Sequence, residues 1–173
     1  MEIYLVRHTE TVCEKGICYG QSDVNIQADY QKQFESIKSQ VPSNTVFYSS
    51  PLKRCAILAD YLSDANYKTD SRLMEMHFGD WELKNWDAIA LEEMNPWMQD
   101  FVNVKVPNGE SFRVLYERVA DFMENEIGTN ISKPIVIVTH AGVIRSILCK
   151  ISNLPLKDAF QNKVDFGEIV RIH

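Results

Sequence analysis

The chain has 173 residues, of which 45% are hydrophobic and 24% charged, and its formal net charge is −6. This length predicts one domain, residues 1–173, with a sizeable core, and the acidic balance disfavours nucleic acid, whose phosphate backbone binds clustered Lys and Arg. No apolar run approaches the roughly 18 residues of a membrane-spanning helix and the first residues do not resemble a signal peptide, so we expect a cytoplasmic protein with no membrane partner.

The hydrophobic pattern alternates between strand-like and helix-like segments along the chain. In order, it predicts a strand at 2–6, a helix at 27–40, a strand at 45–50, a helix at 51–64, a short strand at 67–69, a helix at 110–127, a strand at 135–140, a helix at 143–151 and an edge strand at 168–173. Residues 86–102 are ambiguous, and Pro96 is expected to interrupt any helix there. Pro51 is expected in the first turn of its helix.

Apolar strands that alternate with helices predict a three-layer α/β/α sandwich around a mostly parallel sheet. Ligands bind such sheets beyond the carboxyl ends of the strands. Unusual polar residues follow three of the predicted strands: Arg7-His8, then Ser49-Ser50-Pro51 leading to Arg54, and Thr139-His140-Ala141-Gly142. If these strands are neighbours, two histidines and two arginines meet at one edge of the sheet.

This set of side chains suits phosphoryl transfer. Two arginines match phosphate oxygens bidentately, and a helix that begins near Ala141 adds backbone N–H donors. A neutral imidazole can attack phosphorus and form a phosphohistidine, while Arg and His stabilise the transferring group without a metal or other cofactor. The departing alkoxide needs a proton, and Glu75 is the candidate acid. Asp80 and Glu82 lie nearby in sequence and are expected to be surface or capping residues.

Five segments in this order resemble motifs of the histidine phosphatase superfamily, in its phosphoglycerate-mutase-like branch. They are LVRHTET (5–11), SSPLKRC (49–55), LMEMHFGDWE (73–82), PNGES (107–111) and VTHAGVIR (138–145). The resemblance implies that His8 is the phosphorylated nucleophile and that Arg7 and Arg54 bind the phosphoryl oxygens. It also implies that His140 stabilises the transferring group, and that Glu75 first donates a proton and then activates water.

The chain departs from the family pattern at Thr9, where the family usually has Gly. A β-branched residue there requires a permitted backbone angle, and we expect its hydroxyl to contact the phosphate. Substrate contacts are also expected from Gln21, which is favoured over the nearby polar Glu10, Thr11 and Ser22, and from the backbone at Ala141.

The segment GICYGQSDV (16–24) is similar to a stretch of the α-ribazole phosphatases, which remove the 5′-phosphate of α-ribazole phosphate in cobalamin nucleotide-loop assembly. The substrate is therefore expected to be a small phosphorylated metabolite. Two alternatives stay within the superfamily: a broad phosphatase of sugar phosphates, and a phosphoglycerate mutase, although the chain is short and lacks the insertions and tail typical of mutases. A non-catalytic phosphate-binding domain is the third.

Several other residues have two interpretations. Trp81, Trp86 and Trp97 either stack on a heteroaromatic base or belong to the core and its rim, and His77 either lines the pocket or is simply part-exposed. The four cysteines show no C-x-x-C pair, so reduced thiols are expected rather than disulfides or zinc ligation. The carboxylate cluster of a magnesium site is also missing from the motifs.

Overall fold

The computed structural model describes residues 2–128 and 132–173, and within them the chain forms one five-stranded sheet in the order β3-β2-β4-β1-β5. The strands are β1 (Ile3–Arg7), β2 (Val46–Ser49), β3 (Lys68–Thr69), β4 (Ile135–Thr139) and β5 (Ile169–Ile172). The pairs β1–β4, β4–β2 and β2–β3 are parallel, and β5 runs antiparallel along β1. The mostly parallel sheet is confirmed, with β5 at an edge as expected.

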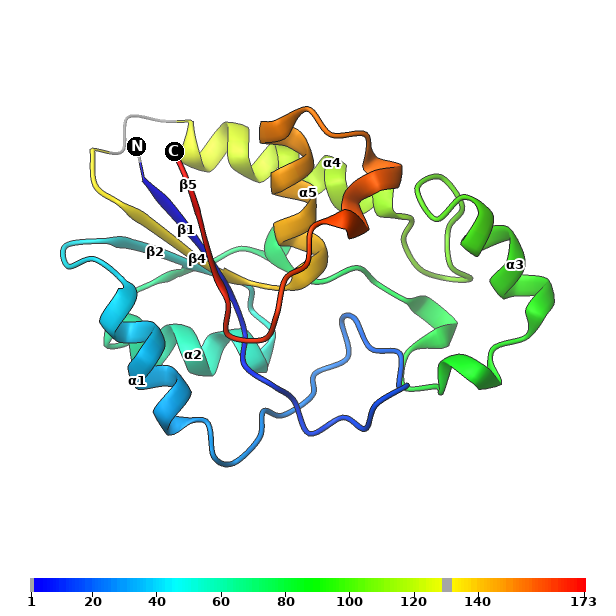
Figure 1. Cartoon of the computed structure of the whole chain (residues 1–173), viewed down its shortest axis with the longest axis horizontal. Helices are drawn as coiled ribbons and strands as arrows, with labels where there is room; N and C mark the ends of the chain where they lie inside the picture. Colours follow the sequence, from blue (N-terminus) through cyan, green and yellow to red (C-terminus); the bar gives the residue numbers. More distant parts are fainter. Residues whose placement is uncertain (1, 129–131) are drawn as a thin grey trace.

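Helices cover both faces of the sheet, as the sequence predicted (Figure 1). They are α1 (Gln31–Gln40), α2 (Lys53–Ser63), α3 (Leu91–Gln99), α4 (Phe112–Phe122) and α5 (Ala141–Ser152). The helices α1 and α2 lie on one face, and α4 and α5 lie on the other, whereas α3 projects beyond the end of the sheet. In the part of the chain that the structure describes, no helix is long and apolar enough to span a membrane.

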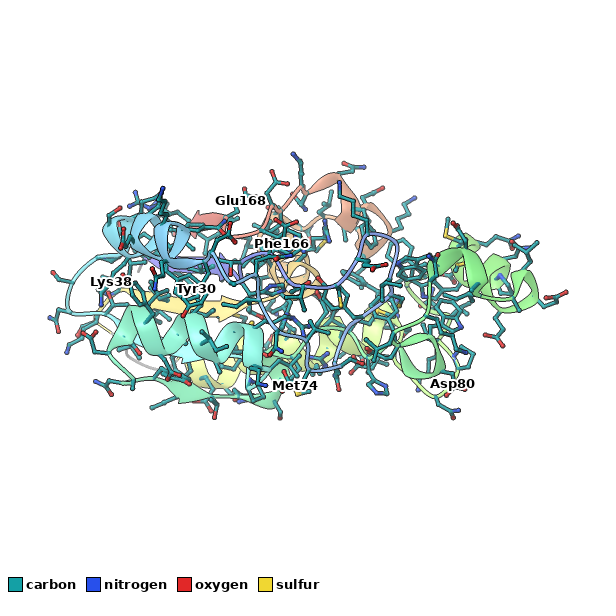
Figure 2. The ribbon with its side chains drawn as sticks, turned by 90° about the horizontal axis from the view of Figure 1, so that it is seen from below. Tyr30, Lys38, Met74, Asp80, Phe166 and Glu168 are labelled. Atoms are coloured by element: carbon teal, nitrogen blue, oxygen red, sulfur yellow. The ribbon has the colours of Figure 1, made fainter. Side chains whose placement is uncertain are left out.

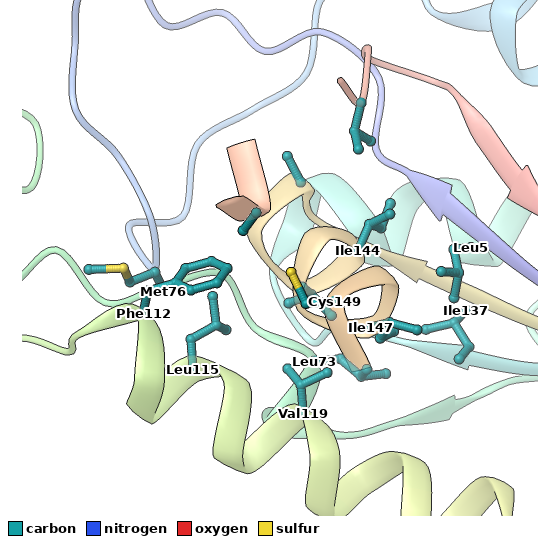
Figure 3. Packing of buried hydrophobic residues seen from close by; sticks show 14 of the residues in the cluster. Leu5, Leu73, Met76, Phe112, Leu115, Val119, Ile137, Ile144, Ile147 and Cys149 are labelled. Carbon is teal, nitrogen blue, oxygen red and sulfur yellow. The ribbon is translucent and has the colours of Figure 1, made fainter. Parts of the chain in front are cut away.

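Alternate residues of β1 pack on opposite faces of the sheet, because successive strand side chains point in opposite directions. Tyr4 and Val6 pack with α1 and α2, whereas Ile3 and Leu5 join the larger cluster under α4 and α5. Figure 3 shows this larger cluster, in which Leu5 and Ile137 of the sheet lie near Ile147 of α5. Burial on both faces explains why the first strand is apolar at every position before Arg7.

The prediction that Pro96 interrupts any helix is wrong, because α3 runs through it from Leu91 to Gln99. Proline at this position removes one intrahelical hydrogen bond, to the carbonyl of Glu92. Glu92 is exposed, so water can satisfy that carbonyl at little cost. The other helices match their predictions within a few residues, and the predicted helix 110–127 is α4 followed by a π-helical turn, Met123–Ile127. The prediction that Pro51 lies in the first turn of its helix is wrong, because α2 begins at Lys53 with Leu52 as its N-cap residue.

The strand register brings the three polar strand ends together. Arg7 at the end of β1 is paired with Thr139 at the end of β4, and Ser49 of β2 lies opposite Val138. His8 and His140 are the next residues along their strands. The carboxyl edge of the sheet therefore carries the polar residues that the sequence placed after its strands.

Candidate active site at the carboxyl edge of the sheet

His8 follows β1 and is only 2% exposed. Its backbone N–H donates to the carbonyl of Thr139, and its carbonyl accepts from the N–H of Gly167, both at 3.1 Å. The ring Nδ1 lies 2.8 Å from the carbonyl oxygen of Thr9. A carbonyl can only accept, so Nδ1 carries the proton and Nε2 keeps a free lone pair.

His140 is the second histidine of this edge and occupies the N-cap position of α5, without a capping hydrogen bond from its side chain. Its Nε2 lies 2.8 Å from Oγ of Ser50, which follows β2, so one contact joins the ends of β4 and β2. Burial, followed by the charge of Arg54, lowers the pKa of both His8 and His140 well below the usual value. Both imidazoles are therefore neutral near pH 7, as a nitrogen nucleophile requires.

Arg7 holds its guanidinium beside His8 through the segment that precedes β5. Its Nη1 donates to the carbonyl of Val164 at 2.7 Å, and its Cζ lies 3.8 Å from the centre of the Phe166 ring. Phe166 also lies 5.6 Å from His8, centroid to centroid. Figure 2 shows Phe166 near the middle of the molecule, close to Glu168. The aromatic ring therefore supports the cation by a cation–π contact and covers the histidine.

Arg54 lies in the first turn of α2 and is fully buried. Its guanidinium donates to the carbonyl of Ser22 at 2.9 Å and to that of Gly20. From the other side, the carboxylate of Glu82 accepts the backbone N–H groups of Gly20, Gln21 and Ser22 at 2.9, 2.9 and 3.1 Å. Residues 20–22 are thus held between a cation on their carbonyls and an anion on their amides.

Glu75 reaches this edge from a segment without helix or strand. Its Oε2 accepts the backbone N–H of Gly142, in the first turn of α5, at 3.1 Å, and its Oε1 accepts that of Met76 at 2.9 Å. A Cβ at position 142 would lie 2.2 Å from Oε1 of Glu75, so only glycine permits this approach. One N–H of the helix N-terminus that was expected to donate to phosphate, that of Gly142, therefore donates to Glu75.

Three of the five buried side-chain polar atoms without a hydrogen-bond partner in the described residues belong to this edge: Arg7 Nε, Thr9 Oγ1 and Arg54 Nε. A buried polar group left unpaired costs about 1–3 kcal/mol, and such groups in native proteins often serve a ligand. Thr9 is not among the residues with positive φ, which confirms that threonine fits where the family pattern has glycine.

The family model described as the histidine phosphatase superfamily (branch 1) matches residues 3–173. The chain belongs to the histidine phosphatase superfamily. It is 30% identical to a "Putative phosphoserine phosphatase 2" of Hydrogenobacter thermophilus, over 99% of this chain and 88% of the relative. It is 26% identical to an "Adenosylcobalamin/alpha-ribazole phosphatase" of Escherichia coli, over 96% and 87%. The crystal structure of a "putative alpha-ribazole-5'-P phosphatase" of Escherichia coli superposes with a TM-score of 0.88 at 25% identity, over 99% of this chain and 89% of that one.

Within this histidine phosphatase, the structure brings together the five residues proposed from the sequence to be catalytic, which are Arg7, His8, Arg54, Glu75 and His140. The other predicted contacts are less direct. The amide Nε2 of Gln21 donates to the backbone carbonyl of Glu75 at 3.1 Å, and Ala141 is buried at the start of α5. A phosphate contact at either residue stays a prediction.

The two acids near Glu75 have different positions. Asp80 is exposed, as expected, and accepts from the amide of Asn108 at 2.9 Å; Figure 2 places it toward the α3 end of the molecule. Glu82 is half-buried rather than at the surface, and it is the C-cap residue of the 3₁₀ turn Gly79–Trp81, as the capping alternative predicted. Its carboxylate also anchors residues 20–22, which the sequence did not predict. Sequence spacing could not reveal this contact, since the two segments are about 60 residues apart.

A cavity of about 100 Å³ opens beside Glu75 and Gly142. Its walls are mostly aromatic, and its lining consists of Tyr19, Glu75, Met76, Phe78, Trp97, Phe101, Phe112, Leu115, Gly142, Arg145 and Phe160. Trp97 is thus the tryptophan that lines it. Trp81 is fully buried and donates Nε1 to Glu93 at 2.7 Å, and Trp86 stacks on Trp97 with 6.0 Å between ring centroids.

Arg145 is a cavity residue that the sequence analysis did not single out. It follows Gly142 by three positions, a spacing that puts both on one face of α5. Its Nε donates to the carbonyl of Asn162 at 3.0 Å, and its guanidinium lies 4.9 Å from the ring centre of Phe160. Burial lowers the pKa of Arg145, and the nearby negative charge of Glu75 raises it in part. Arg145 is the last residue of the motif VTHAGVIR, and this position in the motif is the sequence signal that could have identified it.

Proposed function

We propose that this protein is a metal-independent phosphomonoesterase that works through a phosphohistidine on Nε2 of His8. The observation that carries the proposal is the contact between Nδ1 of His8 and the carbonyl of Thr9, which leaves Nε2 unprotonated beside the buried Arg54 and the part-buried Arg7. A free lone pair, a neutral ring and nearby cations are the requirements for attack on a phosphate dianion. The unpartnered Nε atoms of Arg7 and Arg54 support phosphoryl binding at this point.

In the first step, Nε2 of His8 attacks phosphorus, the new P–N bond forms, and the bond between phosphorus and the ester oxygen breaks. The carboxyl group of Glu75 gives its proton to the departing alkoxide. The transferring group carries negative charge on its oxygens, which Arg7, Arg54 and His140 stabilise. Nδ1 of His8 stays protonated and donates its hydrogen bond to the carbonyl of Thr9 throughout, so the phosphorylated ring is held in one orientation.

In the second step, the carboxylate of Glu75 takes a proton from water as the oxygen attacks phosphorus. The P–N bond breaks, the electron pair returns to Nε2 of His8, and inorganic phosphate leaves. Glu75 ends this step protonated and His8 neutral, which restores the starting state. One carboxyl group serves both steps, because the leaving alkoxide and the incoming water occupy the same side of phosphorus in turn.

The substrate we propose is α-ribazole 5′-phosphate, with the cobalamin nucleotide loop as its pathway. The segment 16–24 and the relatives named as α-ribazole phosphatases support this choice. The aromatic cavity next to Glu75 lies on the side from which the leaving group departs, and Trp97 in its wall offers a surface for a flat heteroaromatic base.

The experiment is a panel of phosphomonoesters assayed with EDTA present: α-ribazole 5′-phosphate, sugar phosphates, phosphoserine, phosphoglycerates and nucleoside monophosphates. The proposal predicts the highest kcat/KM for α-ribazole 5′-phosphate. Equal turnover of many esters would contradict α-ribazole 5′-phosphate as the specific substrate and indicate a phosphatase of broad specificity. Exchange between phosphoglycerate isomers would indicate a mutase. The absence of turnover and of a phosphorylated His8 would leave a phosphate-binding domain.

A further inference from the structure

The segment that carries Glu75 has no regular secondary structure of its own. After a single 3₁₀ turn, Ser71–Leu73, residues 75–78 lie in no helix or strand. Their backbone groups therefore need partners from other parts of the chain. Glu75 nevertheless approaches the backbone of Gly142 so closely that a single Cβ would collide with it. Something outside the segment must hold it there.

Arg118, on α4, binds three backbone carbonyls of this segment. Its Nη1 donates to the carbonyls of Arg72 and Met74, each at 2.7 Å, and its Nη2 donates to that of Glu75 at 2.9 Å. The planar guanidinium directs these donors at fixed angles, which a flexible ammonium cannot do. The segment is therefore attached to α4 at three points, and one of them is the backbone of Glu75 itself.

Glu110 orients that guanidinium and holds the segment on its other side. Its two carboxylate oxygens accept from Nε and Nη2 of Arg118 at 2.9 and 2.8 Å, a bidentate pair. The same carboxylate accepts the N–H of His77 at 2.9 Å, and the N–H of Glu110 donates to the carbonyl of His77 at 2.8 Å. Both side chains are mostly buried, at 18% and 16% exposed, so solvent screens the pair little.

We propose that Arg118, oriented by Glu110, is a positioning residue for the proton donor Glu75. The guanidinium holds the backbone on both sides of residue 75, and this placement sets the carboxylate against the N–H of Gly142. Because a displacement of about 1 Å can lower a rate about 100-fold, a looser segment would impair proton transfer first. This role rests on the proposed function, in which Glu75 protonates the leaving group.

The test compares two esters that differ in their need for a proton, p-nitrophenyl phosphate and glycerol 3-phosphate. The variants are Arg118→Lys, which keeps the charge but loses the fork, and Glu110→Gln, which keeps the size. Arg113→Lys is the matched control, because Arg113 lies on the exposed side of the same helix and its side chain bonds only to Asn103 among the hydrogen bonds of the described residues. We expect Arg118→Lys and Glu110→Gln to lower kcat for glycerol 3-phosphate about 10- to 100-fold and the rate of the p-nitrophenol burst, which reports the first step alone, less than about threefold. The burst is measured because both esters share the second step, in which Glu75 activates water.

A purely structural role would lower both rates by one factor, namely the fraction of folded enzyme, and that result would overturn the proposal. A second check uses the Glu75→Gln background. There, Arg118→Lys should have almost no further effect on glycerol 3-phosphate, because the positioned group is already removed. Full additivity of the two losses would contradict the proposal.

A turnover-independent measurement separates this proposal from the proposed function. The amide resonance of Gly142 in an NMR spectrum reports its hydrogen bond to Glu75. We expect Arg118→Lys to shift it in the direction that Glu75→Gln does, and Arg113→Lys to leave it in place. An unmoved Gly142 resonance in Arg118→Lys would overturn the positioning role whatever the activity, whereas the absence of a phosphorylated His8 in the wild-type protein would overturn the proposed function alone.

Discussion

The imidazole rings of His8 and His140 meet edge to face, with 5.2 Å between their centroids and 61° between their planes. The parallel pairing of β1 with β4 produces this contact, because each histidine directly follows its strand. Two protonated rings at this distance would repel each other in a buried site that also contains Arg54. The free protein therefore holds two neutral imidazoles, one with its Nε2 lone pair free and the other bound to Ser50.

Replacing the nucleophile should abolish the chemistry. We expect His8→Ala to lower kcat by at least about 1,000-fold and to prevent acid-labile phosphorylation of the protein, measured by rapid quenching and mass spectrometry. His173→Gln, at the exposed C-terminal residue, is the control histidine variant. If His8→Ala kept more than a tenth of the wild-type rate, the phosphohistidine pathway would be wrong.

The loss of activity on removal of the Glu75 carboxyl group should depend on how much the leaving group of the ester needs a proton. We expect Glu75→Gln to lower kcat about 100- to 10,000-fold for an alkyl phosphate, the usual range of general acid catalysis. An aryl phosphate such as p-nitrophenyl phosphate departs without protonation and should lose far less in its first step, which a burst of p-nitrophenol measures. Equal losses in the alkyl rate and the aryl burst would rule out Glu75 as the proton donor.

The two neutral histidines should make the protein less stable in mild acid. The pKa of His8 and of His140 is well below 6.5 in the folded protein, chiefly because of burial. The unfolded chain therefore binds more protons than the folded one below about pH 6.5. The free energy of unfolding should fall as the pH drops through this range, by up to about 1.4 kcal/mol per pH unit for each histidine.

Urea unfolding at several pH values measures this slope. His140→Gln should flatten the stability curve between pH 6.5 and 5, because glutamine does not titrate. Parallel curves for the wild-type protein and this variant would show that folding does not lower the pKa of His140. Above about pH 7.5, where neither state protonates its histidines, the difference between the two proteins should be constant.

Thr9→Val should separate stability from function. The hydroxyl of Thr9 is buried without a partner, so its removal should leave the free energy of unfolding unchanged or raise it by up to about 1 kcal/mol. The same change should lower kcat/KM about tenfold, through loss of a hydrogen bond to a charged phosphate oxygen.

Thr11→Val is the matched control for this prediction. The hydroxyl of Thr11 donates to the Tyr19 hydroxyl at 2.9 Å, so its loss should lower the free energy of unfolding by about 1 kcal/mol. An unchanged kcat/KM in Thr9→Val would mean that its hydroxyl does not reach the phosphate.

The sequence alone determined the layers of the protein and which polar residues lie at the carboxyl edge of its sheet. Fully apolar strands such as Ile3–Val6 and Ile135–Val138 indicate a sheet that is buried on both faces, and polar residues directly after such strands must lie at its carboxyl edge. These are local patterns of two or three neighbouring residues. For that reason the positions of Arg7, His8 and His140 were predictable before the fold, and Arg54 followed from the helix that begins soon after the second strand.

Only the tertiary structure decided which side chains hold the segments around these residues in place. Arg118 bonds to Glu75 across 43 positions of sequence, and Glu82 bonds to Gly20 across 62. These side chains bind backbone groups of segments without periodicity, and any residue type there except proline would present the same carbonyl and N–H. The helix through Pro96 was missed for a similar reason, since the exposure of Glu92, which Pro96 leaves without an intrahelical partner, is a property of the fold. Patterns of side chains predict burial and motif chemistry, whereas contacts between a side chain and a distant backbone depend on how the loops pack.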